Sequence, residues 1–101
     1  MLQVIRFTKE NFDKLLDVKS STVRLGIKSY SLGTAKLECV ETGRTSIKTI
    51  EQLRIARFED LDDEYAIKDG FSSLNELKEE LERIYDEQID SRTLLTVVDF
   101  M

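Results

Sequence analysis

The sequence predicts an α+β fold with about five or six strands and about three short helices, on three observations. Segments rich in β-branched residues, separated by glycine or polar clusters, indicate strands in residues 2–58. Two stretches of the second half begin with helix-capping residues and continue with apolar residues at helical spacing. A further β-rich segment, 93–100, lies near the end of the sequence. With 101 residues, the chain 1–101 is expected to form a single domain.

The first two elements are a strand and a short helix. Residues 2–7 are expected to form the strand, and Thr8 is a suitable N-cap for the helix. Phe12, Leu15 and Leu16 lie at three- and four-residue spacing, so they share one face of this helix, which should end near Asp17.

Three strands and two connections are expected next. Residues 20–25 are β-rich, and a loop with Gly26, Tyr30 and Gly33 precedes a second apolar segment with Leu37, Cys39 and Val40. Residues 42–44, Thr-Gly-Arg, suit a hairpin turn. Residues 45–58 look extended, but their apolar positions change alternation phase midway, which indicates a bulge or a bend.

The acidic second half contains the two remaining helices. Asp62 can cap a short helix that Gly70 stops, and Ser73 with Glu76 three residues later suits a capping box for the next helix. The apolar stripe of that helix comprises Leu74, Leu77, Leu81, Ile84 and Tyr85. The glutamates between 76 and 82, Glu80 included, are expected to face solvent. In the last strand, Leu95, Val97 and Phe100 are expected in the core.

Composition restricts the function classes. The chain is 41% hydrophobic and 35% charged, which is typical of a folded protein. It contains one cysteine and no histidine, which disfavours zinc sites, internal disulfides and histidine-dependent triads, so neither metal nor cofactor is expected. It has no apolar run of membrane-span length, and its start does not resemble a signal peptide, so we expect a cytoplasmic protein without a membrane partner.

The charge is distributed unevenly. The net charge is −5, yet residues 1–57 hold eleven basic and six acidic residues, whereas residues 58–101 hold four and fourteen. A basic half suits a one-sided surface for a polyanion such as RNA. The alternative is that acidic helices simply follow basic strands, without a role in binding.

A small polar constellation lies around the strand 20–25. Strand alternation puts Ser20, Thr22 and Arg24 on one face, and Lys19 just before the strand can fold over the same face. An ammonium, a hydroxyl and a guanidinium around one volume would attract an anion or a polar base edge. The alternative is a strand-forming threonine between solvated cations.

These residues also carry a family resemblance, because four elements occur in order over nearly the whole chain. The sequence resembles the ASCH family of the PUA-like superfamily in Lys19-Ser-Ser-Thr22-Val-Arg24, in Tyr30 and Gly33, in Arg57-Phe-Glu-Asp-Leu61 and in Asp69-Gly-Phe-Ser-Ser-Leu74. The resemblance implies a PUA-like small β-barrel flanked by helices. It also implies a cleft beside the barrel for RNA or a modified nucleoside.

Two departures from the family pattern are visible. Many ASCH members have Gly-Arg or Gly-Lys before the motif lysine, whereas this chain has Asp17-Val18, which removes a basic contact. Where the family usually shows Pro-Gly-Asp, this chain has Leu32-Gly33-Thr34, which changes the loop.

The resemblance extends to small bacterial ASCH proteins that are acetylcytidine amidohydrolases with a lysine, a threonine and a glutamate. These roles fall on Lys19, Thr22 and Asp69. The threonine would attack the amide carbonyl, the lysine would accept its proton, and the acid would assist departure of the amine. Aspartate is one methylene shorter than glutamate. A helix-terminal acid before a glycine stop is the alternative for Asp69.

Three further residues are candidates for binding RNA or a nucleoside. Tyr30 can stack on a base or cover the end of the barrel. Arg57 can bind phosphate or pair with Glu59 or Asp60 in a turn, and Lys28 can extend the positive surface or remain solvated. Cys39 is expected to pack as a small apolar residue.

The sequence leaves three function classes open. A noncatalytic module that binds RNA or a nucleoside and an amidohydrolase acting on acetylcytidine rank close together. A ribonuclease ranks behind them, since there is no histidine for acid–base cleavage.

Overall fold

The computed structural model describes residues 2–15 and 19–101, and it confirms the α+β prediction. In chain order the elements are β1 (Gln3–Phe7), α1 (Lys9–Lys14), β2 (Ser21–Leu25), β3 (Gly33–Cys39), β4 (Thr45–Arg57), a 3-10 turn (Phe58–Asp60), α2 (Asp63–Lys68), α3 (Leu74–Tyr85) and β5 (Leu94–Phe100). The residues predicted for the face and end of the first helix, Leu16 and Asp17, lie outside the described residues, and α1 has Leu15 as its C-cap.

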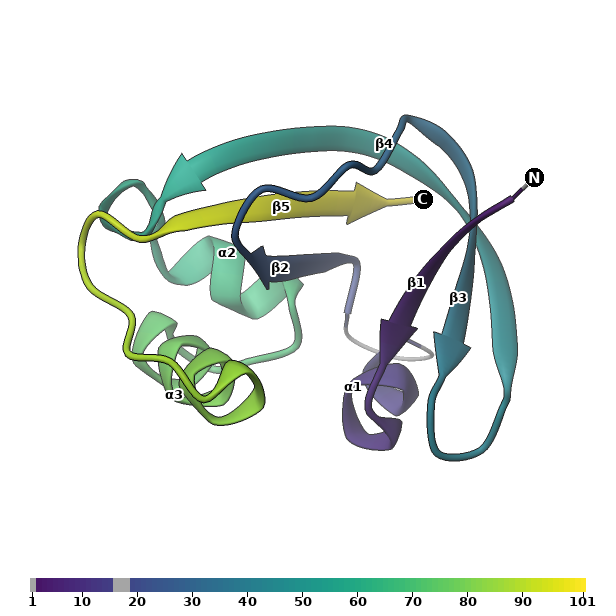
Figure 1. Cartoon of the computed structure of the whole chain (residues 1–101), viewed down its shortest axis with the longest axis horizontal. Helices are drawn as coiled ribbons and strands as arrows, with labels where there is room; N and C mark the ends of the chain where they lie inside the picture. The colour runs from purple at the N-terminus through teal and green to yellow at the C-terminus, as the bar shows by residue number, and fades with distance from the viewer. Residues whose placement is uncertain (1, 16–18) are drawn as a thin grey trace.

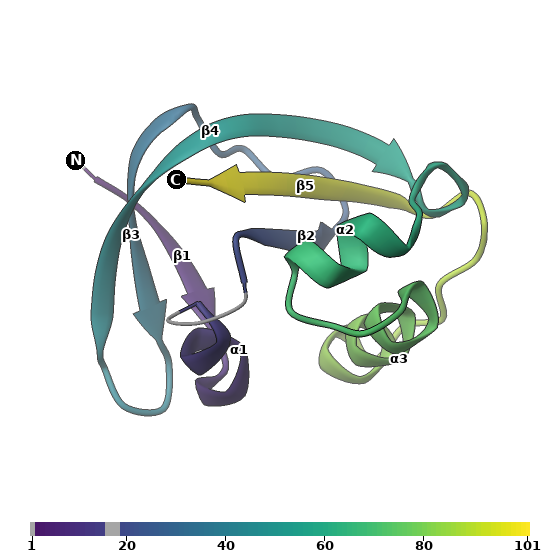
Figure 2. The same ribbon diagram turned by 180° about the vertical axis from the view of Figure 1, so that it is seen from behind.

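The strands form one mixed sheet in the order β1-β3-β4-β5-β2. Only the β1–β3 pair is parallel among the described strands. Figure 1 shows this sheet curled into a half-barrel, with α1 beside β1 and β3. Figure 2 shows α2 and α3 next to each other, close to β2. β2 therefore lies between the helices of the two ends of the molecule.

The predicted irregularity in the fourth strand is confirmed. β4 pairs with β3 through its first half and with β5 through its second half. The register with β5 shifts between Ile50 and Gln52, so one extra residue is inserted there. Such a bulge bends a strand and increases its twist. The bend lets one 13-residue strand belong to both halves of the curled sheet.

Two apolar clusters lie on opposite faces of β5, which pairs with β4 and β2. Val98 packs with the cluster around β1, β3 and α1, whereas Val97 packs with the cluster beneath α2 and α3. The predicted core residues of this strand are buried, with Leu95 at 0% and Phe100 at 6% exposure. In α3, Leu77 and Leu81 are buried as predicted, whereas Ile84 is 41% exposed.

The three N-cap predictions are confirmed by side-chain hydrogen bonds, although the Glu76 carboxylate accepts from the Ser72 hydroxyl rather than completing a capping box with the Ser73 N–H. Thr8 accepts from the backbone of Asn11 at 3.3 Å, Asp62 accepts from Glu64 at 3.0 Å, and Ser73 accepts from Glu76 at 3.2 Å. Each bond satisfies a backbone N–H that a helix start would otherwise leave unpaired. The described part of the chain contains no helix that is long and apolar enough to cross a membrane.

Candidate functional site

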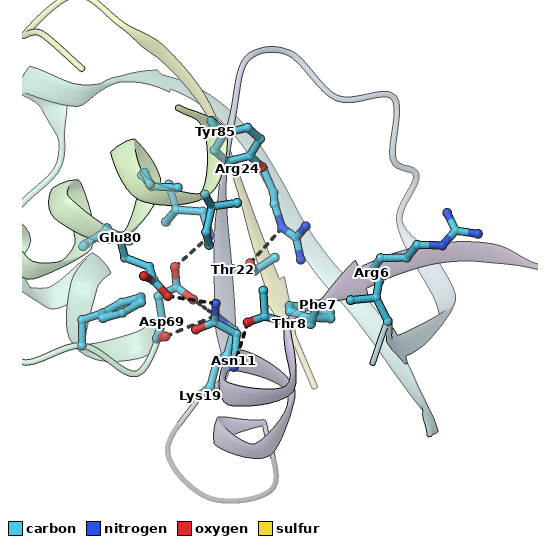
Figure 3. A pocket seen from close by; sticks show the side chains of 16 residues that line it. Arg6, Phe7, Thr8, Asn11, Lys19, Thr22, Arg24, Asp69, Glu80 and Tyr85 are labelled. Carbon is cyan, nitrogen blue, oxygen red and sulfur yellow. Dashed lines mark hydrogen bonds and ion pairs between the residues drawn. The ribbon is translucent and has the colours of Figure 1, made fainter. Parts of the chain in front are cut away.

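A half-open pocket of about 190 Å³ lies between β2, α1 and α3. Its polar residues come from segments far apart in the sequence: Arg6, Thr8, Asn11, Lys19, Thr22, Arg24, Asp69 and Glu80. Its apolar wall includes three aromatic side chains, Phe7, Phe71 and Tyr85. Figure 3 shows Asp69 and Glu80 beside Lys19, with Thr22 and Arg24 on the neighbouring strand. The structure thus places all three residues of the predicted Lys-Thr-acid set, and Arg24, around one cavity.

Lys19 and Asp69 form a buried ion pair at the base of the pocket. Their side chains are 2% and 3% exposed, and the Lys19 ammonium contacts Oδ1 of Asp69. The ammonium also donates to the backbone carbonyl of Asp69 at 3.2 Å, and Oδ2 of Asp69 accepts from the backbone N–H of Val23 at 3.1 Å. Oδ2 therefore accepts a hydrogen bond from the backbone, whereas Oδ1 has its ion-pair contact with Lys19 but no hydrogen-bond partner among the described residues.

The end of α2 sets the position of this carboxylate. Asp69 is the C-cap of α2, and the next residue, Gly70, has a φ of +87°. This left-handed conformation turns the chain out of the helix and favours glycine. The predicted helix stop is thus confirmed, and the turn leaves Asp69 facing β2.

Burial and neighbouring charges weaken the hold of Lys19 on its proton. Burial lowers the pKa of Lys19 well below its ordinary value of 10.5, and the nearby Arg24 and Lys14 cations act in the same direction. Glu80 acts in the opposite direction, and a contact with the Asp69 carboxylate also favours the ammonium. Lys19 therefore holds its proton less firmly than a lysine on the protein surface does.

Thr22 and Arg24 form a second polar pair on β2. Nε of Arg24 donates to Oγ1 of Thr22 at 3.1 Å. The Arg24 guanidinium carbon lies 4.4 Å from the centre of the Phe7 ring, a distance that suits a cation–π contact. Because Oγ1 already accepts from Arg24, the hydroxyl hydrogen of Thr22 is free to be donated elsewhere.

The other three predicted binding residues are not among the described residues that line the pocket. Tyr30 packs against the core cluster of β1 and β3, and burial raises its pKa. Lys28 approaches the pocket indirectly, because its ammonium lies 5.8 Å from the ring of Tyr85. Arg57 lies at the end of β4 and has an ion-pair contact of 3.9 Å with Glu59. This agrees with the alternative prediction that Arg57 pairs with an acidic residue in a turn.

Asn11 and Glu80 are among the pocket residues that the sequence analysis did not propose for the site. Asn11 was not singled out, and Glu80 was expected to face solvent, which is wrong, since its side chain is only 13% exposed and lines the pocket. The neighbouring Glu79 is exposed as expected. The helical spacing contained a signal, because Glu80 lies three residues after Leu77 and four before Ile84, on the edge of the apolar stripe.

Among residues 2–15 and 19–101, no three acidic or cysteine side chains cluster as metal ligands would. The buried Cys39 belongs to the core cluster, in agreement with its expected packing role.

Comparisons with known proteins identify the fold. No family model and no curated protein matches the sequence. Among solved structures, an ASCH domain from Lactobacillus crispatus JV V101 matches with a TM-score of 0.75 at 13% identity, covering 98% of this chain and 77% of that one. A DUF984 protein from Enterococcus faecalis V583 matches with a TM-score of 0.68 at 13% identity, covering 99% and 75%. The chain therefore has an ASCH-like fold, as its sequence motifs predicted.

Proposed function

We propose that this protein binds a nucleoside, free or as one residue of an RNA strand, in the pocket beside β2. The observation that supports this proposal is that one cavity is lined by Lys19, Thr22 and Arg24 together with the aromatic rings of Phe7 and Tyr85. Aromatic faces stack on bases, and a few convergent polar groups give orientation and specificity.

The size of the cavity favours a small ligand. Sites for drug-sized ligands usually measure roughly 300 to 1,000 Å³. A pocket of about 190 Å³ suits a single base or nucleoside rather than a folded RNA segment. A longer strand would insert one splayed nucleotide and leave its neighbours outside.

Arg24 is the cation best placed to contact a phosphate. Lys19 is neutralised by Asp69, whereas Arg24 makes no ion pair with the described residues. Its guanidinium lies against the Phe7 ring, and the N–H groups at the edge of the guanidinium plane remain able to donate. Binding to RNA or a nucleotide should therefore weaken as salt increases.

Amide hydrolysis of acetylcytidine is the second candidate, and the depressed pKa of Lys19 favours it. The Thr22 oxygen would attack the acetyl carbonyl while neutral Lys19 accepts the hydroxyl proton. Collapse of the intermediate would break the C–N bond, and the proton on Lys19 would pass to the departing cytidine amine. Water would then hydrolyse the acetyl-threonine to acetate, with Lys19 as the base. In this scheme Asp69 positions Lys19, because its carboxylate is paired with the Lys19 ammonium.

One experiment separates these candidates. Wild type, Thr22→Val and the exposed control Thr34→Val are incubated with acetylcytidine, and cytidine and acetate are followed by chromatography. Calorimetry measures the affinity for cytidine, acetylcytidine and a short single-stranded RNA at two salt concentrations. Turnover that disappears only in Thr22→Val supports the hydrolase, and binding without turnover supports the binding module. Cleaved RNA would support the ribonuclease, whereas neither binding nor turnover would refute the proposal.

A further inference from the structure

Asn11 and Glu80 form a polar wall of the pocket that comes from two different helices. Asn11 belongs to α1 and is 6% exposed, and Glu80 belongs to α3. Nδ2 of Asn11 donates to Oε2 of Glu80 at 3.3 Å. Both side chains line the same cavity as Lys19 and Thr22.

Arg83 fixes the other oxygen of Glu80. Its Nε and Nη2 atoms both lie 2.7 Å from Oε1. These charged hydrogen bonds lower the pKa of Glu80, and the Asn11 bond acts in the same direction. At neutral pH the carboxylate is ionised, so it can accept hydrogen bonds from a ligand but cannot donate one.

The hydrogen bond to Glu80 also determines which way the Asn11 amide points. A flipped amide would put its carbonyl oxygen against the carboxylate, where two acceptors repel each other. In the observed orientation, Oδ1 is buried and has no hydrogen-bond partner among the described residues. A buried acceptor without a partner is unfavourable, and a donor that reached it would offset this cost.

Asp69 is a poorer candidate for contact with a ligand. Its side chain is only 3% exposed, and its carboxylate is paired with the Lys19 ammonium below the surface of the pocket. Glu80, at 13% exposure, is the more accessible of the two pocket carboxylates.

We propose that Glu80, held by Asn11 and Arg83, selects ligands that present an N–H donor edge, such as an amino-bearing base, over ligands that present a carbonyl at the same place. This inference rests on the proposed nucleoside binding. The ionised Glu80 carboxylate is an acceptor that lines the pocket, so an amino group complements it, whereas a carbonyl oxygen would be repelled.

Cytidine and uridine provide the test, because they have nearly the same size but differ at the amino-to-carbonyl edge. Calorimetry gives both affinities for wild type, Glu80→Gln and Glu79→Gln, the last a matched change at an exposed position of the same helix. We expect wild type to prefer cytidine by about tenfold or more, as a hydrogen bond to a charged group implies. Glu80→Gln should reduce the preference to about threefold or less, because its amide can donate to a carbonyl.

A second variant protects the test against misfolding. Arg83 has a side chain that is 61% exposed, so Arg83→Met should fold while it frees the Glu80 carboxylate, and its preference should lie between those of wild type and Glu80→Gln. Equal binding of cytidine and uridine by wild type, or an unchanged preference in both variants, would overturn this inference and leave the proposed function standing. If wild type bound neither nucleoside, both the proposed function and the proposed role of Glu80 would be refuted.

Discussion

Lys19 and Asp69 lie 50 residues apart in the sequence and form an ion pair that is almost completely buried. The pair joins the end of α2 to the residues that lead into β2, and the Val23 N–H bond to Asp69 adds a second link between the same elements. Lys19 and Asp69 also line the pocket. Any role in binding is therefore coupled to the stability of the fold at this point.

Replacing one partner of the pair should destabilise the protein strongly. In Asp69→Asn, the Lys19 ammonium would be buried without a countercharge, which usually costs about 3–5 kcal/mol. Urea unfolding followed by circular dichroism would measure the loss. Glu87→Gln, at an exposed position of the same acidic half, should change the free energy of unfolding by less than about 0.5 kcal/mol.

A double variant separates the ion pair from other effects of the substitution. Lys19→Met combined with Asp69→Asn should be more stable than Asp69→Asn alone, because it removes the uncompensated charge. Strictly additive losses in the double variant would show that the two side chains are not coupled.

The depressed pKa of Lys19 predicts how stability changes with pH. Below the pKa values of both the folded and the unfolded state, the lysine is charged in each state and its burial is unfavourable to the fold. Between the lowered folded pKa and the ordinary value of 10.5, the unfolded chain binds more protons, so the free energy of unfolding rises with pH. The slope can reach about 1.4 kcal/mol per pH unit. Lys19→Met should lack this contribution.

Urea titrations of wild type and Lys19→Met at several pH values between 6 and about 10 would measure the contribution of Lys19 to the free energy of unfolding. The difference in unfolding free energy, wild type minus variant, should increase with pH. A decrease would mean that contact with Asp69 outweighs burial and raises the lysine pKa instead.

Features governed by neighbouring residues were predictable from the sequence. Thr8, Asp62 and Ser73 cap helices because a side-chain oxygen two or three residues away can reach the free N–H groups of a first turn. The phase change within residues 45–58 predicted the β4 bulge, because alternation of apolar residues reports directly on which face is buried.

Features governed by tertiary packing were harder to predict. The motif resemblance brought Lys19, Thr22 and Asp69 together as candidates, but the spacing of residues could not show that Asp69 forms a buried ion pair with Lys19. Glu80 was assigned to solvent from its charge alone, whereas its position beside Leu77 on the helix surface, and the packing of α1 nearby, place it in the pocket wall.

The turn after α2 should tolerate an added methyl group poorly. Gly70 has a φ of +87°, and a Cβ there would lie 2.9 Å from Cδ of Lys14. The Lys14 side chain is itself held in place, because its Nζ lies 4.0 Å from the centre of the Phe71 ring. Gly70→Ala should therefore cost about 2–3 kcal/mol, from left-handed strain and from crowding. Gly43 is the matched control, because its φ is +75° but the described residues leave open space around its Cβ position. Gly43→Ala should cost only the strain, about 1–2 kcal/mol, and equal losses in thermal or urea unfolding would exclude crowding at Gly70.

Arg24 should contribute more to binding a nucleotide than a nucleoside. In Arg24→Lys the charge is kept, but the planar fork that donates to Thr22 and lies against the Phe7 ring is lost. We expect the affinity for cytidine 5′-monophosphate to fall by about tenfold and the affinity for cytidine to fall less, because a charged hydrogen bond to phosphate contributes about 1.5–3 kcal/mol. Calorimetry at low and moderate salt would measure both, with Arg92→Lys as a control at an exposed position. Equal affinities of wild type and Arg24→Lys for the nucleotide would show that the phosphate does not contact this guanidinium, and a ligand would then have to enter the pocket with its phosphate directed away from β2.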